Sequence, residues 1–194
     1  LCEGQYLDIS FERESEVTVD AYLEMIGKKT AALVGASVQA GAILATDDLD
    51  VVEAYRRFGY DLGMAFQMAD DVKGTFWTSA ASGKPEAGDV RKRKKTLPLV
   101  WALEHASDAE RRRLTEIYRP AATTDGLALS GETPMTDDDV AEVLEILERC
   151  GAREHALSEA RRYRDLALAH LDRLPCPPDR RDEMAALVGS VIAA

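Results

Sequence analysis

Two adjacent aspartates interrupt a hydrophobic stretch of the chain. Asp70 and Asp71 lie within residues 64–72, whose other members are mostly apolar. Burying an ionised carboxylate costs free energy unless a cation or hydrogen-bond donors compensate for the lost water. Mg²⁺ prefers oxygen ligands and commonly joins one or two carboxylates to the phosphate groups of a substrate. The aspartate pair therefore predicts a magnesium site that binds a diphosphate.

Helical spacing adds further polar groups to this candidate site. In a helix, Gln67, Asp70, Asp71 and Gly74 fall at positions i, i+3, i+4 and i+7, so they share one face. The alternative is a solvated last turn of an ordinary helix. Acidic residues are unfavourable at a helix C-terminus, and Met68 marks the helix as mostly buried. An electrostatic cost at this position suggests a function that offsets it.

Three more side chains could bind phosphate oxygens. Lys29 and Thr30 lie next to each other within an apolar helical segment, and Lys84 follows Gly83 in a loop. A lysine together with loop backbone amides can hold a phosphate group. Exposed lysines on a solvated surface are the commoner explanation for either pattern taken alone.

The elements that must position these residues all have helical periodicity. Apolar residues recur at helical spacing, with loops expected at 74–88 and 120–134 where Gly, Pro, Ser and Thr gather. We expect helices at 17–46, 49–73, 96–106, 108–118, 136–149, 153–174 and 179–194. No strand pattern and no internal repeat is visible, so the sequence predicts a single all-α domain over residues 1–194.

Composition excludes several classes of function. The net charge of −11 and the isoelectric point near 4.8 argue against binding to nucleic acid or to an anionic membrane. No stretch approaches the roughly 20 apolar residues that a membrane span needs, and no signal peptide is visible. Three cysteines without metal-ligand spacing indicate reduced thiols and a cytoplasmic location.

Four motifs in sequence order give these residues a context. They are Gly4-Gln5-Tyr6-Leu7-Asp8; Tyr22 through Lys29-Thr30; Phe66-Gln67 through Asp70-Asp71; and Gly83-Lys84, Asp89 and Lys95-Thr96-Leu97-Pro98. Together they resemble the motifs of the trans-isoprenyl diphosphate synthases, the polyprenyl synthetase family. Each motif is unspecific alone, whereas four in the same order over about half of the chain are a strong signal.

The resemblance implies an isoprenoid-synthase-type bundle of helices around a deep central cavity. It also implies a magnesium-dependent prenyltransferase of isoprenoid biosynthesis, in which isopentenyl diphosphate attacks an ionised allylic prenyl diphosphate. By the same resemblance Asp70 and Asp71 bind the metal, and Phe66 lines the isopentenyl pocket. The residues expected to contact the allylic diphosphate are Lys29, Thr30, Gln67 and Lys84, and those expected to be catalytic are Lys29, Thr30, Asp70 and Lys84. The family usually forms homodimers.

The chain departs from the family pattern in three respects. Gly74 stands where the second aspartate-rich motif usually has its third aspartate, and Ala87 stands where the lid usually has glycine. The first aspartate-rich motif, which lies upstream in the family, is missing. Since Leu1 begins in the middle of a helical pattern, we expect the C-terminal half to two-thirds of a longer synthase, insufficient for activity alone. Two alternatives stay open: a non-catalytic half-length partner of a complete subunit, and a terpene-cyclase-like enzyme of the same fold.

Overall fold

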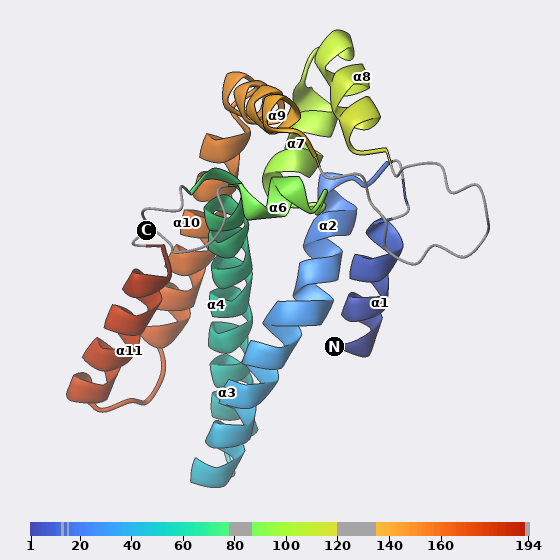
Figure 1. Cartoon of the computed structure of the whole chain (residues 1–194). Helices are drawn as coiled ribbons and strands as arrows, with labels where there is room; N and C mark the ends of the chain where they lie inside the picture. Colours follow the sequence, from blue (N-terminus) through green and yellow to red (C-terminus); the bar gives the residue numbers. More distant parts are fainter. Residues whose placement is uncertain (13, 15, 78–86, 120–134, 193–194) are drawn as a thin grey trace.

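The computed structural model describes residues 1–12, 14, 16–77, 87–119 and 135–192, and these residues form helices without a strand (Figure 1). The predicted all-α class is therefore confirmed. In chain order the helices are α1 (Cys2–Phe11), α2 (Val19–Ile26), the π-helical segment η1 (Gly27–Ala31), α3 (Ala32–Ala45), α4 (Leu49–Phe76), α6 (Gly88–Arg91), α7 (Leu97–His105), α8 (Asp108–Ile117), α9 (Asp137–Arg149), α10 (Ala152–Leu171) and α11 (Pro178–Ile192).

Helix α4 is the long central element, with α3 and α10 packed along it (Figure 1). Two glycines on α4 allow the chain of η1 and α3 to come close. A Cβ atom at Gly63 would lie 2.7 Å from Cα of Ala31, and one at Gly59 would lie 3.0 Å from Cα of Gly35. Any side chain at these positions would separate the helices, so close packing explains both glycines.

Side-chain caps fix where several helices begin. The Thr18 hydroxyl accepts a hydrogen bond from the Ala21 N–H, the Asp48 carboxylate accepts from two N–H groups of α4, and Thr136 caps α9. An N-cap of this kind satisfies N–H groups that have no partner within the helix. The helix starts expected near residues 17, 49 and 136 are therefore confirmed.

Two expectations about helix extent need correction. The segment predicted as one helix over 17–46 contains the π-helical stretch Gly27–Ala31, which separates α2 from α3. Helix α4 continues to Phe76, so Gly74 lies within a helix and not at the start of a loop. A glycine lowers helix stability by about 1 kcal/mol without breaking the helix, and the burial of Thr75 beyond it favours continuation.

One core of buried residues joins helices that are far apart in the sequence. It joins α2, α4, α7 and α10 through Tyr22, Met25, Ile26, Met64, Met68, Val72, Leu97, Val100, Ala156 and Ala160.

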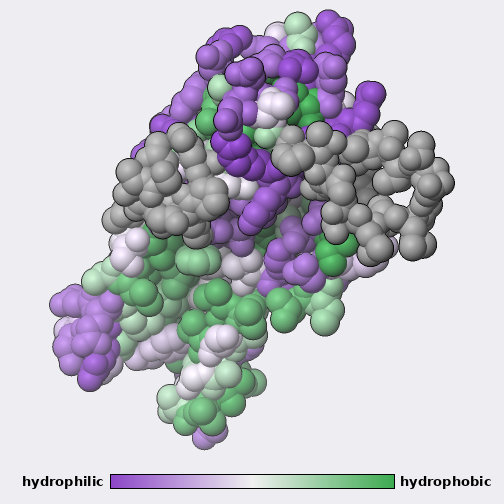
Figure 2. All heavy atoms as spheres, viewed as in Figure 1, coloured by the Kyte–Doolittle hydropathy of each residue, from purple (hydrophilic) through white to green (hydrophobic). Residues whose placement is uncertain are grey.

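Apolar side chains are also exposed on α3, where Leu44 is 90% exposed, and Figure 2 shows hydrophobic residues gathered over the end of this helix. Within the described parts of the chain, no helix is both long and apolar enough to span a membrane.

Candidate functional site

The π-helical segment η1 presents Lys29 and Thr30 toward neighbouring helices. A π turn widens the backbone, and such turns are frequent at functional sites. The Thr30 hydroxyl donates a hydrogen bond to Oε1 of Gln67 on α4, at 2.8 Å. The Lys29 ammonium pairs with the carboxylate of Asp8 on α1. The structure therefore joins Thr30 to Gln67 and pairs Lys29 with Asp8 on α1.

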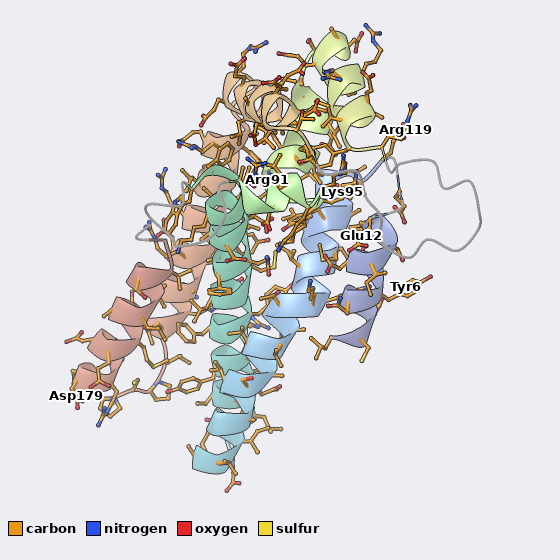
Figure 3. The ribbon with its side chains drawn as sticks, viewed as in Figure 1. Tyr6, Glu12, Arg91, Lys95, Arg119 and Asp179 are labelled. Atoms are coloured by element: carbon orange, nitrogen blue, oxygen red, sulfur yellow. The ribbon has the colours of Figure 1, made fainter. Side chains whose placement is uncertain are left out.

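Helix α1 reaches η1 through a glycine. A Cβ atom at Gly4 would lie 2.3 Å from the backbone nitrogen of Lys29, so only glycine allows this approach. Tyr6, on the same helix, is 72% exposed and points away from the other helices (Figure 3). The Gly-Gln motif of the sequence thus serves a packing role at Gly4, where α1 supports the backbone of the lysine–threonine pair.

Asp71 differs from the expectation of an open aspartate pair. Its side chain is fully buried, and its oxygens accept hydrogen bonds from the Tyr22 hydroxyl, the Leu97 N–H at 2.9 Å and Nε2 of Gln67 at 3.1 Å. Burial raises the pKa of Asp71 to about 6, while Lys94 and these donors oppose the rise. The two carboxylates therefore differ in their surroundings, because Asp71 is enclosed by donors whereas Asp70 is only half-buried. Successive residues of a helix point about 100° apart, which explains the difference.

Asp70 is the aspartate that is open to a ligand. It is half-buried, and within the described ranges no hydrogen bond or ion pair engages its carboxylate. Phe66 lies one turn earlier on α4 and is 51% exposed. Gln67, between them in sequence, is half-buried. Asp70, Gln67 and Phe66 thus form a partly open face of α4, beside which Thr30 is held by its bond to Gln67.

Lys94 is a site residue that the sequence reading missed. Its Nζ lies 3.9 Å from Oδ1 of Asp71 and 3.4 Å from Oδ2 of Asp89. Burial alone would lower the pKa of Lys94, but the charges of Asp71, Asp89 and Asp70 raise it above its ordinary value. The ammonium therefore stays charged beside the Asp70 face.

Lys94 is one of five consecutive basic residues, 91–95, and nothing in the sequence distinguishes it from its neighbours. The sequence reading selected the neighbouring Lys95 as part of a motif. In the structure Lys95 lies over the ring of Tyr118, with Nζ 5.6 Å from the ring centre, and it is labelled in Figure 3. Only the turn between α6 and α7, whose register no sequence pattern gives, decides which lysine reaches the aspartates.

The remaining predicted residue, Lys84, lies outside the described residues. No group of three or more His, Cys, Asp or Glu side chains in the described part of the chain is arranged to hold a metal ion. Asp70 alone still fits Mg²⁺, because this ion is commonly held by one or two carboxylates together with substrate phosphates and water. Hollows of about 360 and 310 Å³ lie elsewhere, and neither is lined by Asp70 or Lys29.

Gly74 makes room for the carboxylate of Asp89. A Cβ atom at residue 74 would lie 2.1 Å from Oδ2 of Asp89, whose side chain is 18% exposed. The same Oδ2 atom is the one that contacts Lys94, at 3.4 Å. The glycine at the position of the expected third aspartate therefore allows an acidic side chain from α6 to lie against α4 one turn after Asp70.

This contact predicts that Gly74→Asp will impair the protein, although it restores the family motif. The new side chain would displace Asp89 and release its contact to Lys94, so we expect the free energy of unfolding, measured by thermal unfolding, to fall by about 1.5 kcal/mol, the size of one charged hydrogen bond. Gly88→Ala is the control, because a Cβ atom there meets nothing within 4 Å. A Gly74→Asp variant as stable as the wild type would contradict the packing argument.

Comparison with known proteins places these features in a family. The sequence pattern described as Polyprenyl synthetase matches residues 1–128. The chain is 34% identical over 192 residues to a (2E,6E)-farnesyl diphosphate synthase of Mycobacterium tuberculosis, covering 99% of this chain and 51% of that protein. It is 37% identical over 192 residues to a short chain isoprenyl diphosphate synthase of Methanothermobacter thermautotrophicus, covering 99% and 54%.

Solved structures agree with the sequence comparison. A geranylgeranyl pyrophosphate synthetase from Pyrococcus horikoshii superposes with a TM-score of 0.86 at 31% identity, covering 100% of this chain and 54% of that one. A geranylgeranyl pyrophosphate synthase from Corynebacterium glutamicum, complexed with isoprenyl diphosphate and magnesium, gives a TM-score of 0.83 at 27% identity, covering 99% and 51%. The chain spans about half the length of the relatives it matches.

Proposed function

Because the chain belongs to the polyprenyl synthetase family, we propose that the protein carrying it is a prenyltransferase that joins isopentenyl diphosphate to an allylic prenyl diphosphate. The observation that carries the proposal is the Asp70 carboxylate, which is half-buried on α4 one turn after the exposed Phe66, while Lys94 lies 3.9 Å from the neighbouring Asp71. A carboxylate that no described residue engages, near an ammonium that stays charged, suits a ligand that brings both a metal ion and negative oxygens.

Each residue of the candidate site would have a distinct role in binding the metal or the diphosphate. Asp70 would hold Mg²⁺, which when bound neutralises charge on the departing diphosphate. Lys94 and Lys29 would bind diphosphate oxygens, for which Lys29 must exchange its pairing with Asp8. Gln67 and Thr30 are already joined at 2.8 Å and would orient the ligand beside Asp70. Lys84 and Phe66 keep the diphosphate and isopentenyl roles that the resemblance implies.

Asp71 does not bind the metal in this proposal, whereas the resemblance implied that both aspartates do. Mg²⁺ binds oxygen at about 2.0–2.1 Å and demands near-octahedral geometry. Both Asp71 oxygens are already used by donors from α2, α4 and α7. Direct coordination by Asp71 would therefore break buried hydrogen bonds, and we assign the metal to Asp70.

One observation favours a second candidate. Gly74 removes the third aspartate of the motif, which suits a terpene-cyclase-like enzyme that ionises a prenyl diphosphate without adding isopentenyl units. The half-length partner subunit is the other open alternative, because the chain spans 51–54% of its curated relatives quoted above. A homodimer and a cytoplasmic location stay predictions for the whole protein.

A product assay separates these functions. The full-length protein is incubated with labelled isopentenyl diphosphate and dimethylallyl, geranyl or farnesyl diphosphate, with Mg²⁺ or with EDTA. The proposal expects longer linear prenyl diphosphates that form only with the metal. Cyclic hydrocarbons as the only products would establish the cyclase. Products that form only after a complete synthase subunit is added would establish the partner role.

A further inference from the structure

The carboxylate of Asp71 joins three separate helices in the core. It receives the Tyr22 hydroxyl from α2, Nε2 of Gln67 from its own helix, and the backbone N–H of Leu97 from α7. Both Tyr22 and Leu97 are almost completely buried, as is Asp71 itself. A carboxylate removed from water keeps its charge only when donors surround it, so these bonds hold one another in place.

The bond to Leu97 replaces a missing helix cap. Leu97 is the first residue of α7, and Pro98 after it has no N–H to offer. The N-cap residue Thr96 makes no capping bond; its hydroxyl lies 3.4 Å from that of Thr75 instead. A carboxylate at a helix N-terminus satisfies an unpaired N–H and interacts favourably with the helix dipole. Asp71 therefore caps α7 from the neighbouring helix α4.

The start of α7 also determines where Lys94 lies. Only two residues separate Lys94 from Leu97, and the Thr96 N–H bonds the carbonyl of Lys94 at 3.1 Å. The Lys94 ammonium then reaches back to within 3.9 Å of Asp71 and 3.4 Å of Asp89. Fixing Leu97 on Asp71 thus fixes the lysine beside Asp71, the residue that follows Asp70 on α4.

We propose that Tyr22 and Asp71 are a buried pair of positioning residues that hold the start of α7, and through it Lys94, against the turn of α4 that carries Asp70. Neither residue touches the metal or the diphosphate. The proposal rests on the proposed function, since the position of Lys94 matters only if a diphosphate binds there. Under this proposal Asp71 positions Lys94, whereas Asp70 holds the metal.

Two single variants of the full-length protein test whether Asp71, like Asp70, binds the metal. The probe is inorganic pyrophosphate with Mg²⁺, measured by titration calorimetry. Asp71→Asn keeps a carbonyl oxygen for the Leu97 N–H, so the magnesium concentration at half-saturation should stay within about threefold of the wild type. Asp70→Asn should raise that concentration by at least about a hundredfold. Equal effects of the two variants would make Asp71 a ligand and overturn the proposal.

Tyr22→Phe removes one hydroxyl from the pair and leaves the ring in the core. We expect pyrophosphate affinity at saturating Mg²⁺ and kcat each to fall about tenfold, with the magnesium dependence unchanged. Tyr118→Phe is the control, because Tyr118 is also buried and its hydroxyl does not bond Asp71. Its affinity should stay within about twofold of the wild type.

A double variant shows whether the effect of Tyr22 passes through Lys94. Lys94→Gln should weaken pyrophosphate binding, and adding Tyr22→Phe should weaken it by less than about twofold more, because contacting or linked residues are non-additive. Full additivity, or a Tyr22→Phe variant that loses thermal stability with unchanged binding, would reduce the pair to a structural role. A wild-type protein that binds no pyrophosphate with Mg²⁺ would instead overturn the proposed function, and this inference with it.

Discussion

Asp70→Asn should lower the turnover of the full-length protein at least about a hundredfold, with little change in thermal stability. The Asp70 carboxylate is half-buried and makes no hydrogen bond or ion pair with another described residue, so the fold does not depend on it. If Asp70 binds the metal that neutralises the departing diphosphate, its loss should cost on the order of 3 kcal/mol of transition-state stabilisation. Steady-state kinetics at saturating Mg²⁺ measure this loss.

The control for Asp70→Asn lies on the same helix. Asp50→Asn changes an exposed aspartate in the first turn of α4, far along the helix from the candidate site. Its loss should cost at most a few tenths of a kcal/mol through the helix dipole and leave turnover unchanged. An Asp70→Asn variant that keeps wild-type turnover would mean that the open carboxylate is an ordinary surface group.

Gly4→Ala should be among the most destabilising single-methyl substitutions in the chain. The added Cβ atom would lie 2.3 Å from the backbone nitrogen of Lys29 and 2.6 Å from the carbonyl carbon of Lys28. Backbone atoms of a packed helix cannot rotate away, so α1 must shift, at a cost of about 2 to 3 kcal/mol. Because α1 supports the backbone of Lys29 and Thr30, which we propose bind the diphosphate, its shift should lower substrate affinity too. Thermal unfolding and the KM for the allylic diphosphate measure the two effects.

Gly41→Ala is the matched control for Gly4→Ala. Gly41 lies within α3, and a Cβ atom there meets nothing within 4 Å. Alanine has the higher helix propensity, so this variant should gain up to about 1 kcal/mol of stability. If both variants had the same effect on unfolding, the close contact between α1 and η1 would not exist in solution.

The sequence predicted the helices well because their signals are local. Capping side chains such as Thr18, Asp48 and Thr136 bond within their own helices and can be read from a few residues. The π turn at Gly27–Ala31 was missed because it shifts the helical phase without ending the helix, and a single glycine at its start does not distinguish it from an ordinary helix. The continuation of α4 past Gly74 depends on the burial of Thr75, which is a tertiary effect.

The sequence named residues for the candidate site, which stay predictions, but could not give their arrangement. Lys29, Thr30 and Gln67 were identified, and the structure joins Thr30 to Gln67. The different surroundings of Asp70 and Asp71 could not be read from the sequence, because they depend on Tyr22 and Leu97, which are 49 and 26 residues from Asp71. A helical wheel shows which residues share a face and not which neighbour covers each of them.

The role of Asp70 as the metal ligand is tested most directly by binding without catalysis. An unreactive thio-analogue of an allylic diphosphate is titrated into the full-length wild-type protein and its Asp70→Asn variant, each with and without Mg²⁺. Our account predicts tight binding by the wild type only with Mg²⁺, and binding by the variant that is weaker by about a hundredfold or more. Equal magnesium-dependent binding by both proteins would contradict it.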